Sequence, residues 1–146
     1  MKFSQGLFTP THPEKYIGRG SIKYRSSWEL RFMNFLDTHP SVKQWASEAI
    51  SIRYENPVAK KVKSYVTDFL IIYEDSGGNR QGELVEIKPF KETTVEAAGR
   101  SVKNQIQAVV NQAKWAAAAE FCKRNGLKFR VVTEHDMFTN TKKTKR

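Results

Sequence analysis

The chain has 146 residues, of which 39% are hydrophobic and 12% aromatic, so it can build one domain with a hydrophobic core and is too short for two. Lysine and arginine outnumber aspartate and glutamate by 25 to 15, and the resulting charge of +10 favours a polyanionic partner, nucleic acid before an anionic membrane. A single cysteine excludes an internal disulfide, and three scattered histidines lack zinc-ligand spacing, so any bound metal is expected to have oxygen ligands.

The first predicted elements are an arm and a helix. Residues 1–24 mix glycine, proline, aromatic and basic residues without periodicity, which predicts an arm lying on the domain or on a ligand. Residues 26–40 predict a helix with Ser26 as N-cap and Glu29 three residues later, as in a capping box. Helical spacing puts on one face of this helix Glu29, Phe32, Met33 and Leu36.

Three strands are expected next, in an antiparallel meander. Residues 49–56 alternate between apolar and polar, residues 62–75 give a longer strand, and residues 82–90 follow a glycine-containing turn. Both faces of the second strand are apolar, so we expect both faces of the sheet to be covered.

A second helix is predicted over residues 101–125, followed by a strand over 128–134. A helix between two strands predicts a crossover that makes the last strand parallel to a neighbour. The predicted fold is a single α/β domain over residues 25–139, with 140–146 as a disordered basic tail. The expected apolar stripe of the helix consists of Val102, Ile106, Val109, Val110, Ala113, Ala117 and Phe121.

Three acids and a lysine are the candidates for chemistry. On a continuous second strand, Asp68 would share an apolar row with Val66, Leu70 and Ile72, and a lone carboxylate there costs several kcal/mol. On the third strand Glu86 and Lys88 share a face. If the acids converge, a divalent cation such as Mg²⁺ would neutralise them, with Glu29 as a third. Together with a basic surface, this set favours metal-assisted phosphodiester hydrolysis.

Structural roles are the alternative for each residue. Glu29 fits a capping box with Ser26, and Glu86 with Lys88 fits a same-face ion pair on a solvated sheet. Asp68 is the hardest to explain structurally, because charged residues are seldom buried without a partner.

The order of elements and the acid positions resemble the PD-(D/E)xK nuclease superfamily. The matching motifs are Glu29, "VTDF" with Asp68, and "VEIK" with Glu86 and Lys88. Wider stretches resemble TnsA-type transposon endonucleases and, more closely, head-completion nucleases of T-even-type tailed phages, namely "YRSSWELRFMNFLD", "YVTDFLI", "VEIKP" and "NQAKWAAAAEFCKRNGLKFRVVTE". The resemblance covers residues 16–139, and a departure is Thr67, where many superfamily members have proline.

The resemblance implies a restriction-endonuclease-like core and a role for each site residue. Asp68 and Glu86 would bind Mg²⁺, or Mn²⁺ as a substitute, with the Ile87 carbonyl as a third ligand. Lys88 would serve the attacking water, and Glu29 would complete the acidic cluster.

Weaker candidates lie around this set. The DNA-contact candidates, for which ordinary surface roles are the alternative, are Arg25, Gln105 and Lys114. Core or surface packing is the first expectation, and base stacking the second, for Trp28, Trp45 and Trp115.

The implied function is a metal-dependent endonuclease that acts on duplex DNA in phage head completion, with portal or neck proteins as partners and no small-molecule cofactor. No apolar run approaches the roughly 20 residues of a spanning helix and no signal peptide opens the chain, so we expect host cytoplasm and virion and no membrane. Two alternatives stay open. One is a non-catalytic head protein that binds DNA or the portal, and the other is a transposition or repair nuclease.

Overall fold

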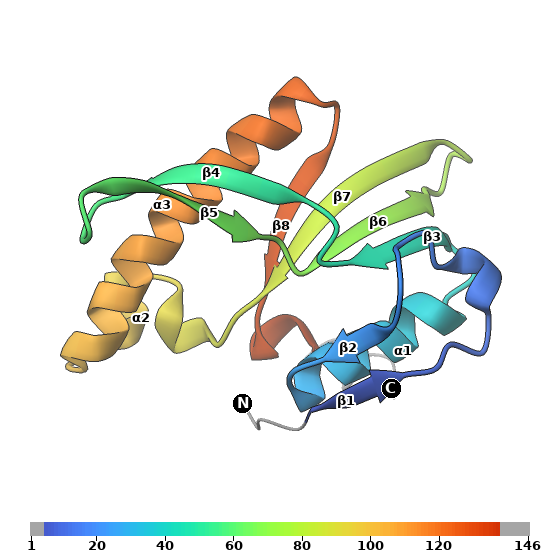
Figure 1. Cartoon of the computed structure of the whole chain (residues 1–146), viewed down its shortest axis with the longest axis horizontal. Coiled ribbons are helices and arrows are strands. Elements are labelled where there is room, and N and C mark those ends of the chain that lie inside the picture. The colour runs from blue at the N-terminus through green and yellow to red at the C-terminus, as the bar shows by residue number, and fades with distance from the viewer. Residues whose placement is uncertain (1–4, 138–146) are drawn as a thin grey trace.

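A four-stranded mixed sheet forms the centre of the computed structural model, which describes residues 5–137 (Figure 1). Its strand order is β3 (Val42–Ser47), β6 (Phe69–Glu74), β7 (Arg80–Ile87) and β8 (Lys128–Val132). Strand β6 is antiparallel to both β3 and β7, and β8 is parallel to β7. The predicted α/β class and the parallel last strand are therefore confirmed, and three strands are antiparallel, but the first of them is not the predicted one.

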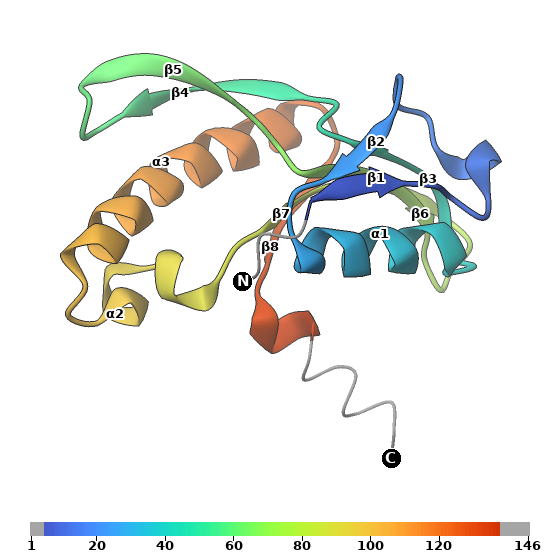
Figure 2. The ribbon, with the colours of Figure 1, turned by 60° about the horizontal axis from the view of Figure 1, so that its bottom comes forward.

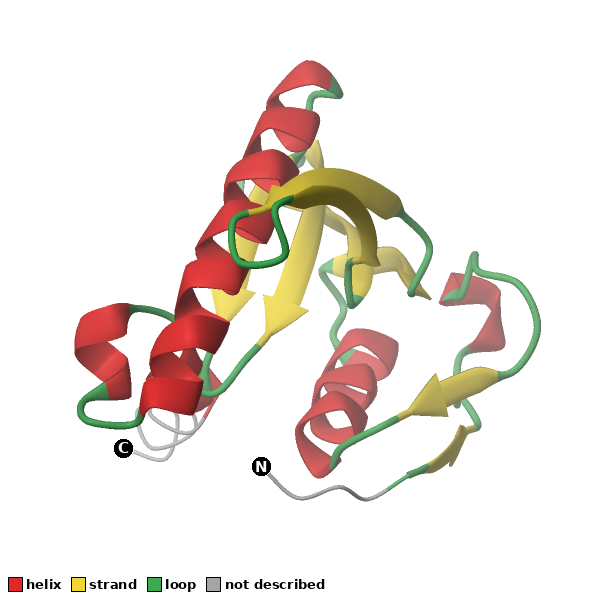
Figure 3. Ribbon diagram, turned by 60° about the vertical axis from the view of Figure 1, so that its left-hand side comes forward, coloured by secondary structure: helices red, strands yellow, loops and turns green. Residues whose placement is uncertain are grey.

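Helices cover both faces of this sheet. Helix α1 (Ser27–Thr38) packs on one face and α3 (Val102–Arg124) on the other, and Figure 3 shows them on either side of the strands. Successive strand residues point to opposite faces, so Val85 joins the α1 core while Leu84 joins Ala118 in the α3 core. The expectation that both faces are covered is confirmed.

The start of α1 has the predicted cap. The Ser26 hydroxyl accepts the Glu29 amide at 3.2 Å, and Glu29 Oε1 accepts the amide of Arg25 at 3.2 Å. The carboxylate thus bonds the residue before the N-cap. The predicted inner face is also confirmed, since Phe32, Met33 and Leu36 are buried and Glu29 is partly buried.

Helix α3 forms where predicted, and Ala117 and Phe121 of the predicted apolar stripe pack against its core, but the first part of the stripe is wrong. Val102, Ile106 and Val109 are 66%, 48% and 40% exposed. The first turns of α3 pack against η2 (Phe90–Glu92) and α2 (Val95–Ala98), and small side chains allow close approach to the sheet. The buried face consists of Ala108, Asn111, Trp115, Ala118 and Cys122. The Asn111 amide donates to the Glu92 carbonyl at 2.9 Å, which explains a polar residue in this row.

The long second strand is in fact two strands. Strand β5 (Lys61–Val66) and β6 are separated at Thr67 and Asp68 and belong to different sheets. Strand β4 (Ser51–Asn56) pairs only with β5, and we call this pair the β4–β5 ribbon. The expected row joining Val66 to Asp68 on one strand face is therefore wrong.

The first strand of the meander is β3, which the sequence analysis missed. Its burial does not alternate, and a register shift between Val42 and Gln44 interrupts its pairing with β6. A strand without alternation carries no period-two signal, so the sequence predicts β4 as the first strand of the meander instead.

The N-terminal arm contains strands that its composition did not indicate. Strand β1 (Gly6–Phe8) pairs antiparallel with β2 (Ile22–Tyr24), and Phe8 and Ile22 are buried in the α1 core. Three-residue strands are too short to show periodicity. Phe8 and Ile22 bring the described part of the arm, residues 5–24, onto the domain.

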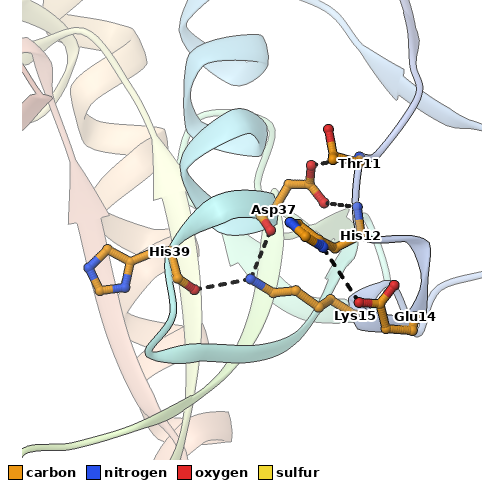
Figure 4. Close-up of polar contacts among 6 residues, drawn as sticks. All are labelled: Thr11, His12, Glu14, Lys15, Asp37 and His39. Carbon is orange, nitrogen blue, oxygen red and sulfur yellow. Dashed lines mark hydrogen bonds and ion pairs between the residues drawn. The ribbon is translucent and has the colours of Figure 1, made fainter.

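Asp37 fixes this arm to the end of α1 (Figure 4). Its carboxylate accepts the main-chain amides of Thr11 at 2.8 Å and His12 at 2.9 Å. Lys15, the last residue of η1 (Pro13–Lys15), donates its ammonium to the Asp37 and His39 carbonyls at 2.9 and 3.0 Å. This lysine thus donates hydrogen bonds to carbonyls at the C-terminus of α1 that have no partner within the helix.

The predicted tail, 140–146, lies outside the described residues. None of the helices that the structure describes is long and apolar enough to cross a membrane.

Candidate active site

Asp68 and Glu86 lie together because two residues outside any strand, Thr67 and Asp68, separate β5 from β6. Asp68 occupies this break, and the pairing of Phe69 with Val85 sets it beside Glu86 of β7. The Ile87 amide donates to Asp68 Oδ2 at 2.7 Å, and the Asp68 amide donates to Glu86 Oε1 at 3.2 Å. Each carboxylate is thus bonded to the main chain at or next to the other acid, and the two acids converge.

Burial gives this pair unusual electrostatics. Glu86 is 4% exposed, and burial and then the Asp68 charge raise the pKa of Glu86 to about 8. Burial also raises the pKa of Asp68, although the hydrogen bond from Ile87 opposes the rise. Two carboxylates in this environment favour a proton or a cation between them over two free negative charges.

Lys88 follows Glu86 and Ile87 at the end of β7. Its amide donates to the Val132 carbonyl at 3.0 Å, which ties the backbone there to β8. The charge of Lys88 lowers the pKa of both Asp68 and Glu86, so its ammonium lies close enough to act on both. The structure therefore brings together Asp68, Glu86 and Lys88 as the sequence predicted.

Glu29 approaches the same pair from α1. Burial and then the Asp68 charge raise the pKa of Glu29, while the Arg25 amide opposes the rise. Among residues 5–137, however, no group of three His, Cys, Asp or Glu side chains is arranged to hold a metal ion. Hydrogen bonds link Asp68 and Glu86 through the main chain. Glu29 has no such bond to either acid among those described and lies at the border of the site.

Glu48 is a site neighbour that sequence reasoning missed. Its amide donates to the Asp68 carbonyl at 2.9 Å, and its carboxylate pairs with Arg25 through contacts of 3.2 and 3.3 Å. Arg25, predicted as a phosphate contact, is therefore held beside Asp68 by an acid. Glu48 has φ of 51°, an uncommon conformation outside glycine that no sequence pattern revealed.

Lys114 reaches the site from α3, whereas Gln105 serves the start of that helix. The Lys114 ammonium lies 5.8 and 5.5 Å from the ring centroids of Tyr54 and Tyr65, and its charge lowers the pKa of Glu86. The Gln105 amide donates to the Gly99 carbonyl at 2.6 Å, which holds the connection from α2 to α3. Lys114 is thus near the acids, and Gln105 has a structural bond.

Packing accounts for the tryptophans, as predicted. Trp45 is fully buried, Trp115 is 8% exposed, and Trp28 packs against the α1 core.

The residues present fit a hard divalent cation. The donors are oxygen atoms only, from the buried Glu86 and the partly buried Asp68, and Ile87, whose carbonyl is the predicted third ligand, lies between Glu86 and Lys88. Magnesium is commonly bound by one or two carboxylates, with waters and phosphate oxygens filling the other positions. Thr67, at the proline position of related nucleases, is fully buried, and its hydroxyl has no hydrogen-bond partner among the described residues.

Comparison with known proteins assigns this constellation to a family. Residues 39–134 match the family described as "TnsA-like endonuclease N terminal", a span that contains Asp68, Glu86 and Lys88. The chain belongs to the TnsA-like endonuclease family. It is also 37% identical over 139 residues to the head completion nuclease of Enterobacteria phage T4, covering 88% of this chain and 90% of that protein.

Family membership confirms the predicted resemblance and the prediction of a nuclease. A TnsA-like endonuclease acts on nucleic acid, and endonucleases with this motif typically use divalent metals. Glu29 lies outside the span that matches the family, which begins at residue 39.

Proposed function

We propose that this chain is a metal-dependent endonuclease that hydrolyses phosphodiester bonds in duplex DNA during phage head completion. The observation that carries the proposal is the hydrogen-bonded pair Asp68 and Glu86 with Lys88 beside it. The similarity to a protein named head completion nuclease supports the biological setting. The charge of +10 supports a polyanionic substrate.

Each residue has a defined task in this proposal. Asp68 and Glu86, with the Ile87 carbonyl, would hold Mg²⁺ or Mn²⁺, and Glu29 would complete the negative field around it. When bound, such a cation polarises the phosphate and lowers the pKa of water. The Lys88 ammonium stabilises the negative charge that develops on the phosphate and orients the attacking water. Arg25 and Lys114 flank this position as phosphate contacts.

The proposed place of action is the filled phage head in the host cytoplasm and in the virion. Portal or neck proteins are the proposed protein partners, because DNA that protrudes from a filled head lies next to them. The similarity to the T4 protein over nine-tenths of its length supports this setting.

Plasmid nicking tests the activity. Wild type, Glu86→Ala and the exposed control Glu96→Ala would be incubated with supercoiled DNA in Mg²⁺, in Mn²⁺ and in EDTA. We expect wild type and Glu96→Ala to nick with either metal and not in EDTA, and Glu86→Ala not to nick. Equal nicking by Glu86→Ala would remove the central ligand of the proposal.

A second candidate function is a non-catalytic head protein that binds DNA or the portal. It is favoured by one observation, that residues 5–137 contain no three acid, His or Cys side chains arranged to hold a metal. Wild type that retards plasmid in a gel but does not nick it with any metal would support this candidate.

A transposition or repair nuclease on the same core is a third candidate, which the family description favours. Phage heads assembled without this protein distinguish the two nuclease settings. Heads that fill with DNA and fail to join tails support head completion, and normal heads support the transposition or repair role.

A further inference from the structure

The β4–β5 ribbon has an exposed side with no role in the core. Its two strands pair only with each other, from Ser51 opposite Val66 to Asn56 opposite Lys61. One side packs on α3 through Ile52 and Tyr54, as Figure 2 shows by the ribbon running along that helix. Every residue of β5 except Tyr65 is exposed. Arg53 lies on the outer face, whereas Lys61 and Lys63 stand opposite Asn56 and Tyr54 on the other face and are still exposed. Both faces of the ribbon therefore offer exposed cations to another molecule.

The ribbon carries an excess of positive charge. Residues 51–66 contain one acid, Glu55, and four basic residues, all of them exposed: Arg53, Lys60, Lys61 and Lys63. None of the four forms an ion pair within residues 5–137, whereas Arg25, Arg124 and Arg130 each pair with a glutamate. Four unpaired cations on a two-stranded element complement an anionic surface.

At the tip of the ribbon, Lys60 has a backbone conformation that glycine adopts more readily. The Asn56 side chain accepts the amides of Val58 and Ala59 at 2.9 Å each, and the Lys60 amide donates to the Asn56 carbonyl at 2.8 Å. This turn holds Lys60 at φ of 55°, a left-handed conformation that glycine adopts without steric cost. A lysine kept at such a position is a candidate for a functional contact.

The base of the ribbon is hydrogen-bonded to the main chain of the active site. The Glu48 amide donates to the Asp68 carbonyl, and the Thr67 amide donates to the Ile50 carbonyl at 3.1 Å. Lys114 lies over Tyr54 and Tyr65, one from each strand of the ribbon. A six-residue strand spans about 20 Å, which corresponds to about six base pairs of duplex at roughly 3.4 Å each.

We propose that the β4–β5 ribbon is the DNA-docking arm of the molecule, with Arg53, Lys61 and Lys63 bound to backbone phosphates about two to five base pairs from the end of the ribbon at the active site. The inference rests on the proposed function for its substrate, duplex DNA. A two-stranded ribbon is narrow enough for the major groove, which is about 12 Å wide. Its phosphate contacts position the duplex and read no sequence.

Two variants with matched charge changes test whether the β4–β5 ribbon binds DNA. The ribbon variant is Arg53→Gln, Lys61→Gln and Lys63→Gln, and the control is Arg80→Gln, Lys123→Gln and Lys128→Gln. The control residues are also exposed and lie outside the ribbon, Arg80 and Lys128 at the starts of β7 and β8 and Lys123 in the last turn of α3. Both variants lose one arginine and two lysines, so they have the same net charge.

Affinity for a 30-base-pair duplex is measured in EDTA at several salt concentrations, with thermal melts to show that both variants fold. Each lost phosphate contact lowers the slope of log affinity against log salt by about 0.9. We expect the ribbon variant to lose about two to three units of slope and at least tenfold in affinity, and the control to lose less than one unit. Equal losses in the two variants would overturn the proposal.

A crosslink supplies a second readout. Cys122, the single cysteine of the chain, is buried, so a photoreactive reagent attached to Lys61→Cys reacts from the ribbon. We expect this variant to crosslink to duplex DNA and Arg80→Cys to crosslink much less. Equal crosslinking from both positions would contradict the proposal that the β4–β5 ribbon binds DNA.

The nicking assay separates this proposal from the proposed function. If wild type binds DNA without nicking and the ribbon variant loses binding, the docking arm stands while the catalytic proposal fails. If wild type nicks and the ribbon variant binds and nicks as wild type does, the docking arm alone is wrong.

Discussion

The main-chain amide of Asp68 donates a hydrogen bond of 3.2 Å to Oε1 of Glu86, so the backbone that carries one acid holds the side chain of the other. The reverse strand-to-strand bond, from the Ile87 amide to Asp68 Oδ2, completes the link. The two carboxylates are therefore held side by side. Four predictions follow from this pair and from the N-terminal arm that Asp37 holds.

Glu86→Ala and Lys88→Ala should separate chemistry from binding. The first removes a ligand and the second removes the cation beside the phosphate, whereas neither residue belongs to the exposed ribbon. We expect nicking to fall at least about 100-fold in each variant. Affinity for duplex DNA in EDTA should stay within about threefold, and for Glu86→Ala it should rise if it changes, because a negative charge leaves the site. Nicking rates and gel retardation are measured on the same preparations, and a parallel loss of both would contradict the separation.

Asp68→Asn should leave the metal-free protein at least as stable as wild type. Burial raises the pKa of Asp68, and the isosteric amide removes a charge while its oxygen can still accept the Ile87 amide. A cation that binds only the folded state stabilises by about 1.4 kcal/mol at ten times its Kd, or a few degrees in Tm. Melting curves in EDTA and in millimolar Mg²⁺ should show this shift in wild type only. A variant that melts well below wild type in EDTA would make Asp68 a structural residue.

The stability of the metal-free protein should fall as the pH rises toward 8. The pKa of Glu86 is raised to about 8, so between the ordinary glutamate range and pH 8 the folded state holds a proton that the unfolded chain releases. The stability is therefore present at low pH and lost as the pH rises through 8, by at most about 1.4 kcal/mol per unit for one group. Urea unfolding in EDTA at pH 5.5 and 7.5 should show a larger loss for wild type than for Glu86→Gln. Identical losses in the two proteins would show that Glu86 does not titrate in this range.

Asp37→Ala should destabilise the fold without touching the acids of the site. It removes two hydrogen bonds from the amides of Thr11 and His12 to a charged acceptor, and a hydrogen bond to a charged group contributes about 1.5–3 kcal/mol. We expect a loss of about 2–4 kcal/mol in the free energy of unfolding, and a smaller loss for Asp37→Asn, which keeps one acceptor oxygen. The exposed control Glu14→Ala should stay within about 0.5 kcal/mol of wild type. Urea denaturation of the three variants measures these differences, and an unchanged Asp37→Ala would show that the arm is not held by this carboxylate.

The sequence by itself determined the elements whose signals are local. The cap at Ser26, the long helix after Ser101 and the strand that carries Glu86 and Lys88 each follow from spacing within a few residues, and each is present. Motif spacing along two segments was also sufficient to select Asp68, Glu86 and Lys88, because acids in apolar strands are rare enough to be noticed.

Only the tertiary structure decided where those strands go. The break at Thr67 and Asp68 sends β5 to the ribbon and β6 to the sheet, and residues 62–75 predict one strand because neither glycine nor proline marks the break. The face of α3 that is buried was likewise decided by what it meets, since Asn111 is buried by a bond to Glu92 while Val102 is left exposed. Glu48 joined the site through a backbone conformation and a bond to Asp68, 20 residues away in sequence. Pairing, burial and backbone conformation of this kind depend on partners distant in the chain, and a periodicity read over a few residues contains no information about them.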